Sequence, residues 1–397
     1  MKSRMAIWLV STIICAAMII LGCNGSGHIK SSPEVQKSPD TVNTPDTAVK
    51  PTSTSEPKAT ESPIEARAAE ILEGMSLEEK VGQMFIVRCP QENAMKKLEE
   101  YHLGGYVLFA NDFEGKTAEQ ASFVIRQYLS LKLPPLIGVD EEGGTVNRVS
   151  KFKTYRSEPF KSPQQLYQSG GFEAIRSDTV EKCELLKRLG ININLAPVCD
   201  VSLEPSDFIH ARSFGRDAEQ TAEYVRIVVQ TMKECGMGSV LKHFPGYGNN
   251  ADTHTAIVHD DREYETFLNS DFIPFRAGIE SGADIVLVSH NVVSCMDSDH
   301  PASLSPVVHR ILRDELGFSG VIITDDLLMD GANEFADGGE AAVLAVNAGN
   351  DMLCCSDFED RIPAVLEAVR SGEISIPRID ESVLRILILK LSLGLID

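Results

Sequence analysis

The sequence has little positive charge for its length, and no two of its cysteines have the C-x-x-C spacing typical of zinc sites. Its 37 Lys and Arg residues stand against 58 Asp and Glu residues in a chain of 397, which gives a formal net charge of −21. Such an acidic surface repels phosphate backbones, so nucleic acid is not expected as a partner. Apart from Cys15 and Cys23, seven cysteines remain, which is an odd number. They predict mostly buried free thiols and no disulfide framework, with Cys354 and Cys355 as the pair most open to reaction.

Long hydrophobic runs are also absent, with one exception near the N-terminus. Residues 5–21 carry no charge and follow Lys2 and Arg4, which is the pattern of an export signal. The run leads directly to Cys23 and resembles a bacterial lipoprotein signal, which is cleaved before a lipid-modified cysteine. We therefore expect residues 1–22 to be the signal and Cys23 to anchor the protein to the cell membrane on its extracytoplasmic side. An ordinary signal peptide or an uncleaved anchor is the alternative.

The segment that follows has almost no large apolar side chains. Residues 24–63 contain 13 Ser or Thr residues and a proline at every sixth position from Pro33 to Pro63. A segment of this kind buries too little apolar surface to offset the entropy lost on ordering. Residues 23–63 are therefore predicted to be a mobile linker, and residues 64–397 to be a single folded domain.

From about residue 64 onward, short apolar runs alternate with longer amphipathic stretches, as in parallel strands joined by helices. Eight runs are candidate strands: Gln83–Val87, Gly105–Phe109, Leu136–Val139, Ile191–Leu195, Ser239–Lys242, Ile285–Ser289, Val321–Thr324 and Asp351–Cys354. Helical patterns cover Thr117–Leu131, Gly171–Leu189, Ala218–Cys235, Pro306–Leu316, Gly338–Ala348, Ile362–Arg370 and Ile379–Leu393. Eight such units fit a (β/α)8 TIM-type barrel better than an open doubly wound sheet.

Polar residues stand at the C-terminal ends of five of these candidate strands. They are Asp140, Asp200, Lys242 with His243, His290 and Asp325. In a barrel those ends meet at one mouth, where the following loops build active sites. Capping of the following helices would explain one or two of these residues, but hardly all of them.

One acid and two arginines form the first candidates. Asp140 leaves its strand into a glycine-containing turn, where a carboxylate can accept two sugar hydroxyls and the glycines let the backbone approach a ligand. Arg148 follows on the same loop. Arg212, on a later loop, offers a fork of donors for a hydroxyl or a carboxylate. The alternative for Arg212 is an ion pair within the protein, to Asp200 or Asp217.

The loop after the fifth candidate strand carries the densest set of polar residues. Lys242 and His243 end the strand, and Asp252 and His254 follow a stretch rich in Gly and Pro. Asp252 can hold one nitrogen of His254 and aim the other at a leaving group, which suits general acid/base chemistry near neutral pH. A metal site that also includes His290 is the alternative, but the spacing matches no zinc pattern.

The seventh candidate strand delivers Asp325 to the mouth. An ionised carboxylate there could attack an anomeric carbon or stabilise an oxocarbenium-like transition state. Asp326 points away from it, because successive side chains of a strand diverge, and is expected to hydrogen-bond within the loop.

Together these motifs resemble glycoside hydrolase family 3, in its β-N-acetylhexosaminidase branch, over nearly all of residues 64–397. The most specific part is the string KHFPG from Lys242, followed by Asp-x-His at residues 252–254. The resemblance implies that Asp325 is the nucleophile, His254 the general acid/base and Asp252 its orienting partner. It implies that the residues gripping the sugar are Asp140, Arg148, Arg212, Lys242 and His243. It also implies a (β/α)8 barrel, no metal or other cofactor, and N-acetylglucosaminides of cell-wall origin as substrates.

The expected reaction is a retaining hydrolysis of terminal β-linked N-acetylglucosamine through a covalent intermediate on Asp325. Because a histidine acid/base leaves no negative charge at its position, an anion such as phosphate could replace water. Phosphorolysis, or another β-glycosidase activity on the same fold, is therefore an alternative. A tethered lipoprotein that binds glycans without turnover is the non-enzyme alternative.

Overall fold

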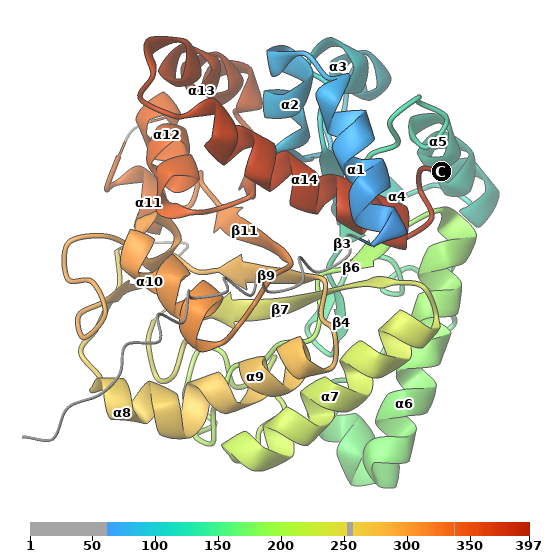
Figure 1. The fold of residues 1–397 in the computed structure, drawn as a ribbon. Helices are drawn as coiled ribbons and strands as arrows, with labels where there is room; N and C mark the ends of the chain where they lie inside the picture. The colour runs from blue at the N-terminus through green and yellow to red at the C-terminus, as the bar shows by residue number, and fades with distance from the viewer. Residues whose placement is uncertain (1–61, 252–256, 337) are drawn as a thin grey trace, which may run out of the picture. The chain divides into compact units, whose positions relative to one another are not determined.

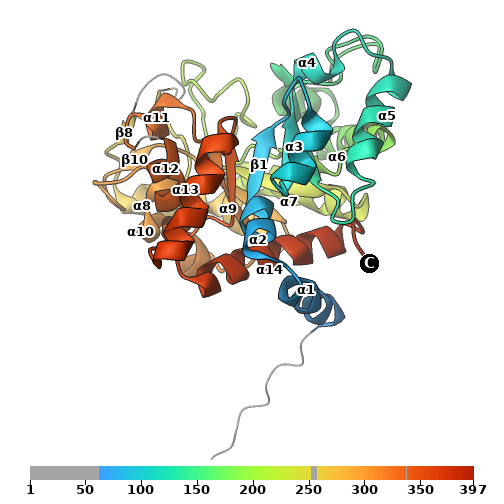
Figure 2. The same cartoon turned by 90° about the horizontal axis from the view of Figure 1, so that it is seen from above.

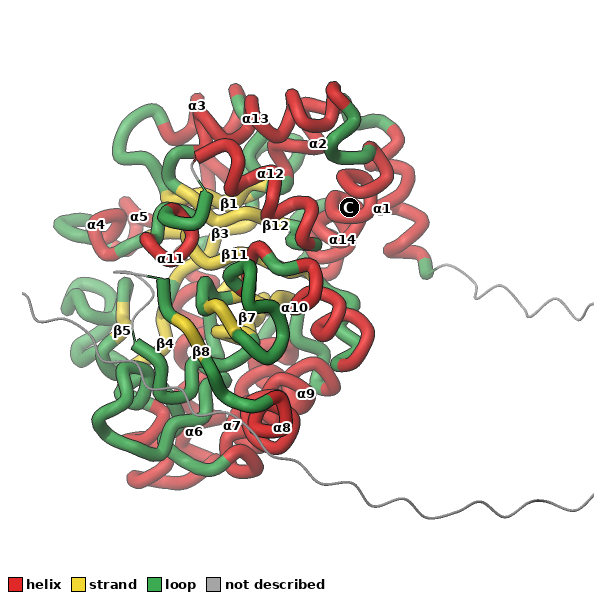
Figure 3. The backbone as a smooth tube through the Cα atoms, turned by 90° about the vertical axis from the view of Figure 1, so that its left-hand side faces the viewer, coloured by secondary structure: helices red, strands yellow, loops and turns green. Residues whose placement is uncertain are grey.

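The computed structural model describes residues 62–251, 257–336 and 338–397. Within them, parallel strands close a barrel in the order β1-β12-β11-β9-β7-β6-β3-β2. These strands are β1 (Phe85–Arg88), β2 (Gly105–Leu108), β3 (Leu136–Val139), β6 (Ile193–Asn194), β7 (Gly238–Phe244), β9 (Ile285–Val288), β11 (Val321–Asp326) and β12 (Met352–Cys355). Each overlaps one predicted strand, so the (β/α)8 prediction is confirmed. Figure 3 shows the yellow strands near the centre with the red helices around them.

Helices join and surround the strands (Figure 1). The α-helices are α1 (Pro63–Glu73), α2 (Leu77–Gln83), α3 (Ala94–Glu100), α4 (Ala110–Phe113), α5 (Ala118–Tyr128), α6 (Pro163–Leu189), α7 (Ala218–Glu234), α8 (Tyr264–Thr266), α9 (Phe272–Glu280), α10 (Pro306–Arg310), α11 (Asp330–Asn333), α12 (Gly338–Ala348), α13 (Phe358–Ser371) and α14 (Ile376–Ser392). Two π-helical turns, η1 (Phe267–Asp271) and η3 (Ile311–Glu315), and one 3-10 turn, η2 (Ala302–Leu304), complete them. Among the described residues, no helix is both long enough and apolar enough to cross a membrane.

Two small sheets lie in the loops that follow barrel strands. The antiparallel pair β4 (Glu141–Gly143) and β5 (Val146–Asn147) follows β3. The parallel pair β8 (His259–Asp260) and β10 (Val292–Val293) joins the loops after β7 and β9. These loops leave the C-terminal ends of the strands, so both small sheets shape the mouth of the barrel.

Several predicted boundaries differ from those of the structure, and local sequence features explain two of them. The α6 helix begins at Pro163 behind a Ser162 cap, and Gly170 and Gly171 interrupt its helical dihedral angles. The prediction took this interruption for the start of the helix and therefore began it at Gly171. Ser62 caps α1 in a capping box, so Pro63 belongs to a helix and not to the predicted linker. Residues 23–61 of the predicted linker, which include Cys23, lie outside the described residues, as does the predicted signal 1–22.

The α14 helix closes the N-terminal end of the barrel. The Lys390 ammonium donates to Oε1 of Gln83, shortly before β1, over 2.6 Å. The buried carboxylate of Asp351, directly before β12, accepts from Ser382 and Arg385 of α14. Figure 2 shows α14 at the opposite end of the molecule from α4 and α11, which follow the C-terminal ends of β2 and β11. The C-terminal ends of the strands therefore remain as the place for a site.

Burial makes Lys390 a group whose titration affects stability. Its side chain is fully buried, and burial lowers its pKa from 10.5 to about 7. Between these two values the unfolded chain binds a proton that the folded chain lacks, so the contribution of Lys390 to stability rises with pH through this window. We expect the melting temperature of wild type, relative to that of Lys390→Met, to rise between pH 7 and pH 10. Parallel melting curves of the two proteins over this range would contradict the prediction.

Candidate active site at the barrel mouth

A buried network of charges lies at the mouth, between the ends of β3 and β7. The Lys242 ammonium lies 2.6 Å from Oδ1 of Asp140 and 2.6 Å from Oε1 of Glu142. Arg212 binds the same Glu142 with two donors, Nε at 3.0 Å and Nη2 at 2.8 Å. Lys242 and Glu142 are 2% and 3% exposed, so their charges interact with little screening by water.

Two further predicted residues extend this network. Nη2 of Arg148 lies 3.9 Å from Oδ2 of Asp140, and Nη2 of Arg212 lies 3.1 Å from Nε2 of His243. The five predicted sugar-binding residues are therefore connected by direct contacts, either to each other or through Glu142. We call Asp140, Glu142, Arg148, Arg212, Lys242 and His243 the mouth cluster.

Glu142 was not among the predicted site residues, although it joins two of them. Lys242 and Arg212 lower its pKa well below the usual range despite the opposing effect of burial, so it stays ionised. A signal was present in the sequence: Asp140 and Glu142 are two residues apart, and in extended backbone such residues share a face.

The alternative for Arg212, an ion pair within the protein, is confirmed, but its partner is Glu142 and not Asp200 or Asp217. Asp200 instead accepts from Nδ1 of His243 at 2.8 Å and from the backbone N–H of Tyr247 at 2.8 Å. Asp217 caps α7 through the N–H of Gln220. Because a guanidinium only donates, the contact with Arg212 makes Nε2 of His243 an acceptor and leaves its proton on Nδ1, toward Asp200.

The glycines after Asp140 approach the chain itself rather than a ligand. Gly143 and Gly144 have positive φ angles of 102° and 64°. An added Cβ would overlap the carbonyl oxygen of Lys161 at Gly143 and the Ser162 side chain at Gly144. The buried Glu141 shapes the same turn by accepting the backbone N–H groups of residues 148–150. The glycines were expected to let the backbone approach a ligand. In the structure they instead let two backbone segments pack closely against each other.

Asp325 and Asp326 are the last two residues of β11, and both are partly exposed. Oδ1 of Asp325 accepts from the N–H of Asp326 at 2.9 Å. Oδ1 of Asp326 accepts from the N–H of Leu328 at 3.0 Å, which confirms its predicted role within the loop. His290 also contacts this segment, because its Nε2 lies 3.0 Å from the carbonyl oxygen of Asp326.

Asp325 and the mouth cluster face the same mouth, because they stand at or just after the C-terminal ends of strands in one closed parallel barrel. On the neighbouring strand β12, burial raises the pKa of the Cys354 thiol well above the usual value, and the charges of Asp326, Asp325 and Asp140 raise it further. Burial also raises the pKa of Cys355. A raised pKa disfavours the reactive thiolate, and the reactivity of this pair stays a prediction.

The described cysteines are free, and most of them are buried, as predicted. Cys295 is the exposed one among them. Nowhere in the described ranges do His, Cys, Asp and Glu side chains gather in a group that could hold a metal ion.

The predicted dyad of Asp252 and His254 lies outside the described residues. The two ends of its loop are held together by Arg262, which binds Asp260, Asp271 and the carbonyl oxygen of Gly246. Arg262 was not among the predicted site residues. Of its partners only Asp260 lies near it in the sequence, and Asp271 and Gly246 are 9 and 16 residues away.

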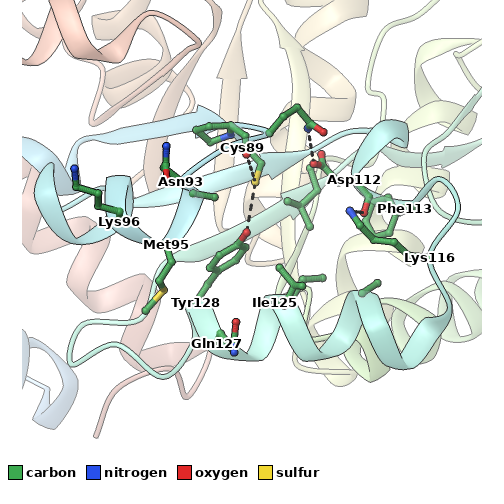
Figure 4. Close-up of a pocket in the computed structure, with 16 residues that line it drawn as sticks. Cys89, Asn93, Met95, Lys96, Asp112, Phe113, Lys116, Ile125, Gln127 and Tyr128 are labelled. Carbon is green, nitrogen blue, oxygen red and sulfur yellow. Dashed lines mark hydrogen bonds between the residues drawn. The ribbon is translucent and has the colours of Figure 1, made fainter.

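A separate cavity of about 450 Å3 lies beside β1, α3, α4 and α5 (Figure 4). No predicted site residue lines it. Its Asp112 carboxylate accepts from the N–H of Phe109 and from Gln91, and burial raises the pKa of Cys89 to about 12. Its titratable groups are therefore engaged or protonated, and the chemistry is expected at the mouth.

The chain is similar in sequence to several known proteins. The model of the glycosyl hydrolase family 3 N-terminal domain matches residues 76–389. A β-hexosaminidase of Methylococcus capsulatus is 32% identical over 274 residues, which cover 68% of this chain and 81% of that protein. The β-hexosaminidase LpqI of Mycobacterium tuberculosis is 30% identical over 343 residues, covering 82% and 85%.

A solved structure is similar over most of the barrel. It is a glycoside hydrolase family 3 β-N-acetylglucosaminidase from Paenibacillus, with a TM-score of 0.74 and 31% identity. The match covers 81% of this chain and 63% of the Paenibacillus chain.

Proposed function

Because this chain belongs to glycosyl hydrolase family 3 and is a glycoside hydrolase, we propose that it is a retaining β-N-acetylhexosaminidase acting on terminal β-linked N-acetylglucosamine. The observation that carries the proposal is that Asp325 and the mouth cluster stand at the same end of one closed parallel barrel. The names of the relatives support the choice of sugar.

In the proposed reaction, Asp325 attacks the anomeric carbon while His254 donates a proton to the glycosidic oxygen. The bond from that carbon to the aglycone oxygen breaks, and a glycosyl ester with Asp325 forms. His254, now neutral, takes a proton from water, whose oxygen displaces Asp325 from the same carbon. Asp252 keeps the imidazole oriented through both steps. Two inversions give net retention of the β configuration.

The mouth cluster would bind the sugar in the same reaction. The Asp140 carboxylate is 15% exposed and presents acceptors to the mouth, where sugar hydroxyls can donate. Arg148 and Arg212 are 31% and 18% exposed and supply donors. Because Glu142 holds Lys242 and Arg212, the donors of these two side chains are fixed before the sugar arrives, which lowers the entropy cost of binding it.

The test is the anomer released first from an aryl β-N-acetylglucosaminide, followed by NMR. The β anomer is expected, and release of the α anomer would overturn the retaining mechanism. The same reaction run with and without phosphate separates hydrolysis from phosphorolysis, because a phosphorylase forms the sugar 1-phosphate. Binding of labelled oligosaccharide with no release of reducing ends would contradict the enzymatic proposal and favour a binding protein.

We further propose that the enzyme is lipid-anchored through Cys23 outside the cytoplasm and acts on cell-wall glycans. The signal-like residues 1–22 support the anchor. When the full chain is expressed in a bacterium, wild type should partition into the detergent phase and Cys23→Ala into the aqueous phase. Equal partitioning of the two proteins would contradict the anchor, and failure to release N-acetylglucosamine from purified cell-wall fragments would contradict the substrate.

A further inference from the structure

An aromatic side chain stands exposed beside the mouth cluster. Phe208, in the loop between β6 and α7, is 40% exposed. Its ring centroid lies 5.9 Å from that of Tyr247, and Tyr247 in turn lies 5.2 Å from the His243 ring, edge to face. Tyr247 is buried, so it links the exposed ring of Phe208 to His243 of the mouth cluster.

The loop holds Phe208 in a defined position. The next residue, Ile209, is buried with Val198 and Tyr247 in a small apolar cluster apart from the main core. The turn is fixed on its polar side, because Ser202 donates to Asp207 over 2.7 Å. Gln164 of α6 binds the carbonyl oxygen of His210 over 2.7 Å. Phe208 is therefore an anchored ring whose exposed part faces solvent.

An anchored aromatic ring at a sugar site has a clear chemical use. A pyranose has polar edges, but its faces carry C–H groups that pack on an aromatic ring and remove apolar surface from water. Binding sites commonly combine such apolar contacts with a few fixed polar groups, as the mouth cluster supplies here. Because the Phe208 ring reaches His243 only through the buried ring of Tyr247, we take the sugar it meets to be a neighbour of the one bound by the mouth cluster.

We propose that Phe208 forms an aglycone subsite, in which its ring stacks on the pyranose attached to the reducing side of the cleaved bond. This inference rests on the proposed function, because it assumes that the mouth cluster binds the sugar that is released. It predicts a preference for oligosaccharides over substrates whose leaving group is small.

The first test compares di-N-acetylchitobiose with N-acetyl-β-glucosaminyl fluoride, whose leaving group cannot stack. The ratio of kcat/KM for the disaccharide to kcat/KM for the fluoride should fall about tenfold in Phe208→Ala. Phe123→Ala is the matched control, since Phe123 on α5 is a phenylalanine 65% exposed, and its ratio should stay within about twofold of wild type. An unchanged ratio in Phe208→Ala, or an equal fall in Phe123→Ala, would overturn the subsite.

The second test measures binding without turnover. The sequence has one tryptophan, Trp8, which lies in the predicted signal. Phe208→Trp in a full chain that also carries Trp8→Phe therefore has a single indole. With Asp325→Ala added to block turnover, di-N-acetylchitobiose should shift its emission to shorter wavelength and free N-acetylglucosamine should shift it far less. No shift with the disaccharide overturns the subsite even if the enzyme acts on another glycan, whereas a wild type inactive on both substrates contradicts the proposed function.

Discussion

Replacing Asp325 with alanine is expected to lower kcat for an aryl β-N-acetylglucosaminide by roughly 10^4-fold, as for other catalytic groups that act as a unit. The reason is that no other described carboxylate at the mouth is placed to replace it. Asp326 binds the N–H of Leu328, and Asp140 and Glu142 are held by Lys242. The measurement is single-turnover and steady-state release of the aryl group.

Stability distinguishes loss of chemistry from loss of the fold. Asp325 is partly exposed at the end of β11, so Asp325→Ala should melt within a few degrees of wild type. Asp330→Ala is the matched control, because Asp330 is an exposed aspartate at the start of the next helix, α11. Its turnover should match that of wild type. Near-normal turnover by Asp325→Ala would show that the nucleophile has been assigned wrongly.

Chemical rescue gives the same variant a specific readout. Removal of the carboxylate leaves room for a small anion on the face of the sugar that Asp325 would attack. Azide should therefore restore part of the turnover of a substrate with a good leaving group, and the product should be the α-glycosyl azide. A β-glycosyl azide would place the missing carboxylate on the opposite face and contradict its role as nucleophile.

The barrel and most of the mouth cluster could be predicted because each depends on local pattern. Buried parallel strands appear in the sequence as short apolar runs. The polar residue that ends such a run stands at the mouth of the barrel, whatever course the next helix takes. Asp140, Lys242 and Asp325 could be placed for this reason. Strand β6 was harder to delimit, since its prediction covered Ile191–Leu195 and the barrel pairs only Ile193 and Asn194 with β3.

The partners within the site could not be predicted, because they join distant segments. Arg212 and Glu142 are 70 residues apart, and nothing near Arg212 distinguishes Glu142 from Asp200 as its partner. The glycines of the turn after Asp140 pose the same problem. The sequence shows that the turn is flexible, but it does not show whether a ligand or the backbone of Lys161 fills the space beside Gly143. Only the folded barrel decides such alternatives.

Glu142 is the residue where this long-range pairing should have its largest consequence. It is the shared partner of two cations, and its side chain is 3% exposed. Replacing Glu142 by glutamine removes its negative charge and turns one acceptor oxygen into an N–H donor that faces a cation. Lys242 or Arg212 then loses its charge partner in a site with little water. Breaking a buried ion pair from one side costs about 3–5 kcal/mol, which corresponds to roughly 10^2- to 10^3-fold if the loss falls on the bound transition state.

We therefore expect Glu142→Gln to lose about 10^2-fold or more in kcat/KM and to unfold at lower denaturant concentration than wild type. A double-mutant cycle with Arg212→Met tests the cause. If Arg212 is destabilising once Glu142 is neutral, then the double variant should be more stable than the sum of the two single effects predicts, by more than about 0.5 kcal/mol. Additive effects would mean that the two residues act independently. The fall in activity would then have to come from Lys242, whose ammonium would keep Asp140 as its remaining carboxylate partner.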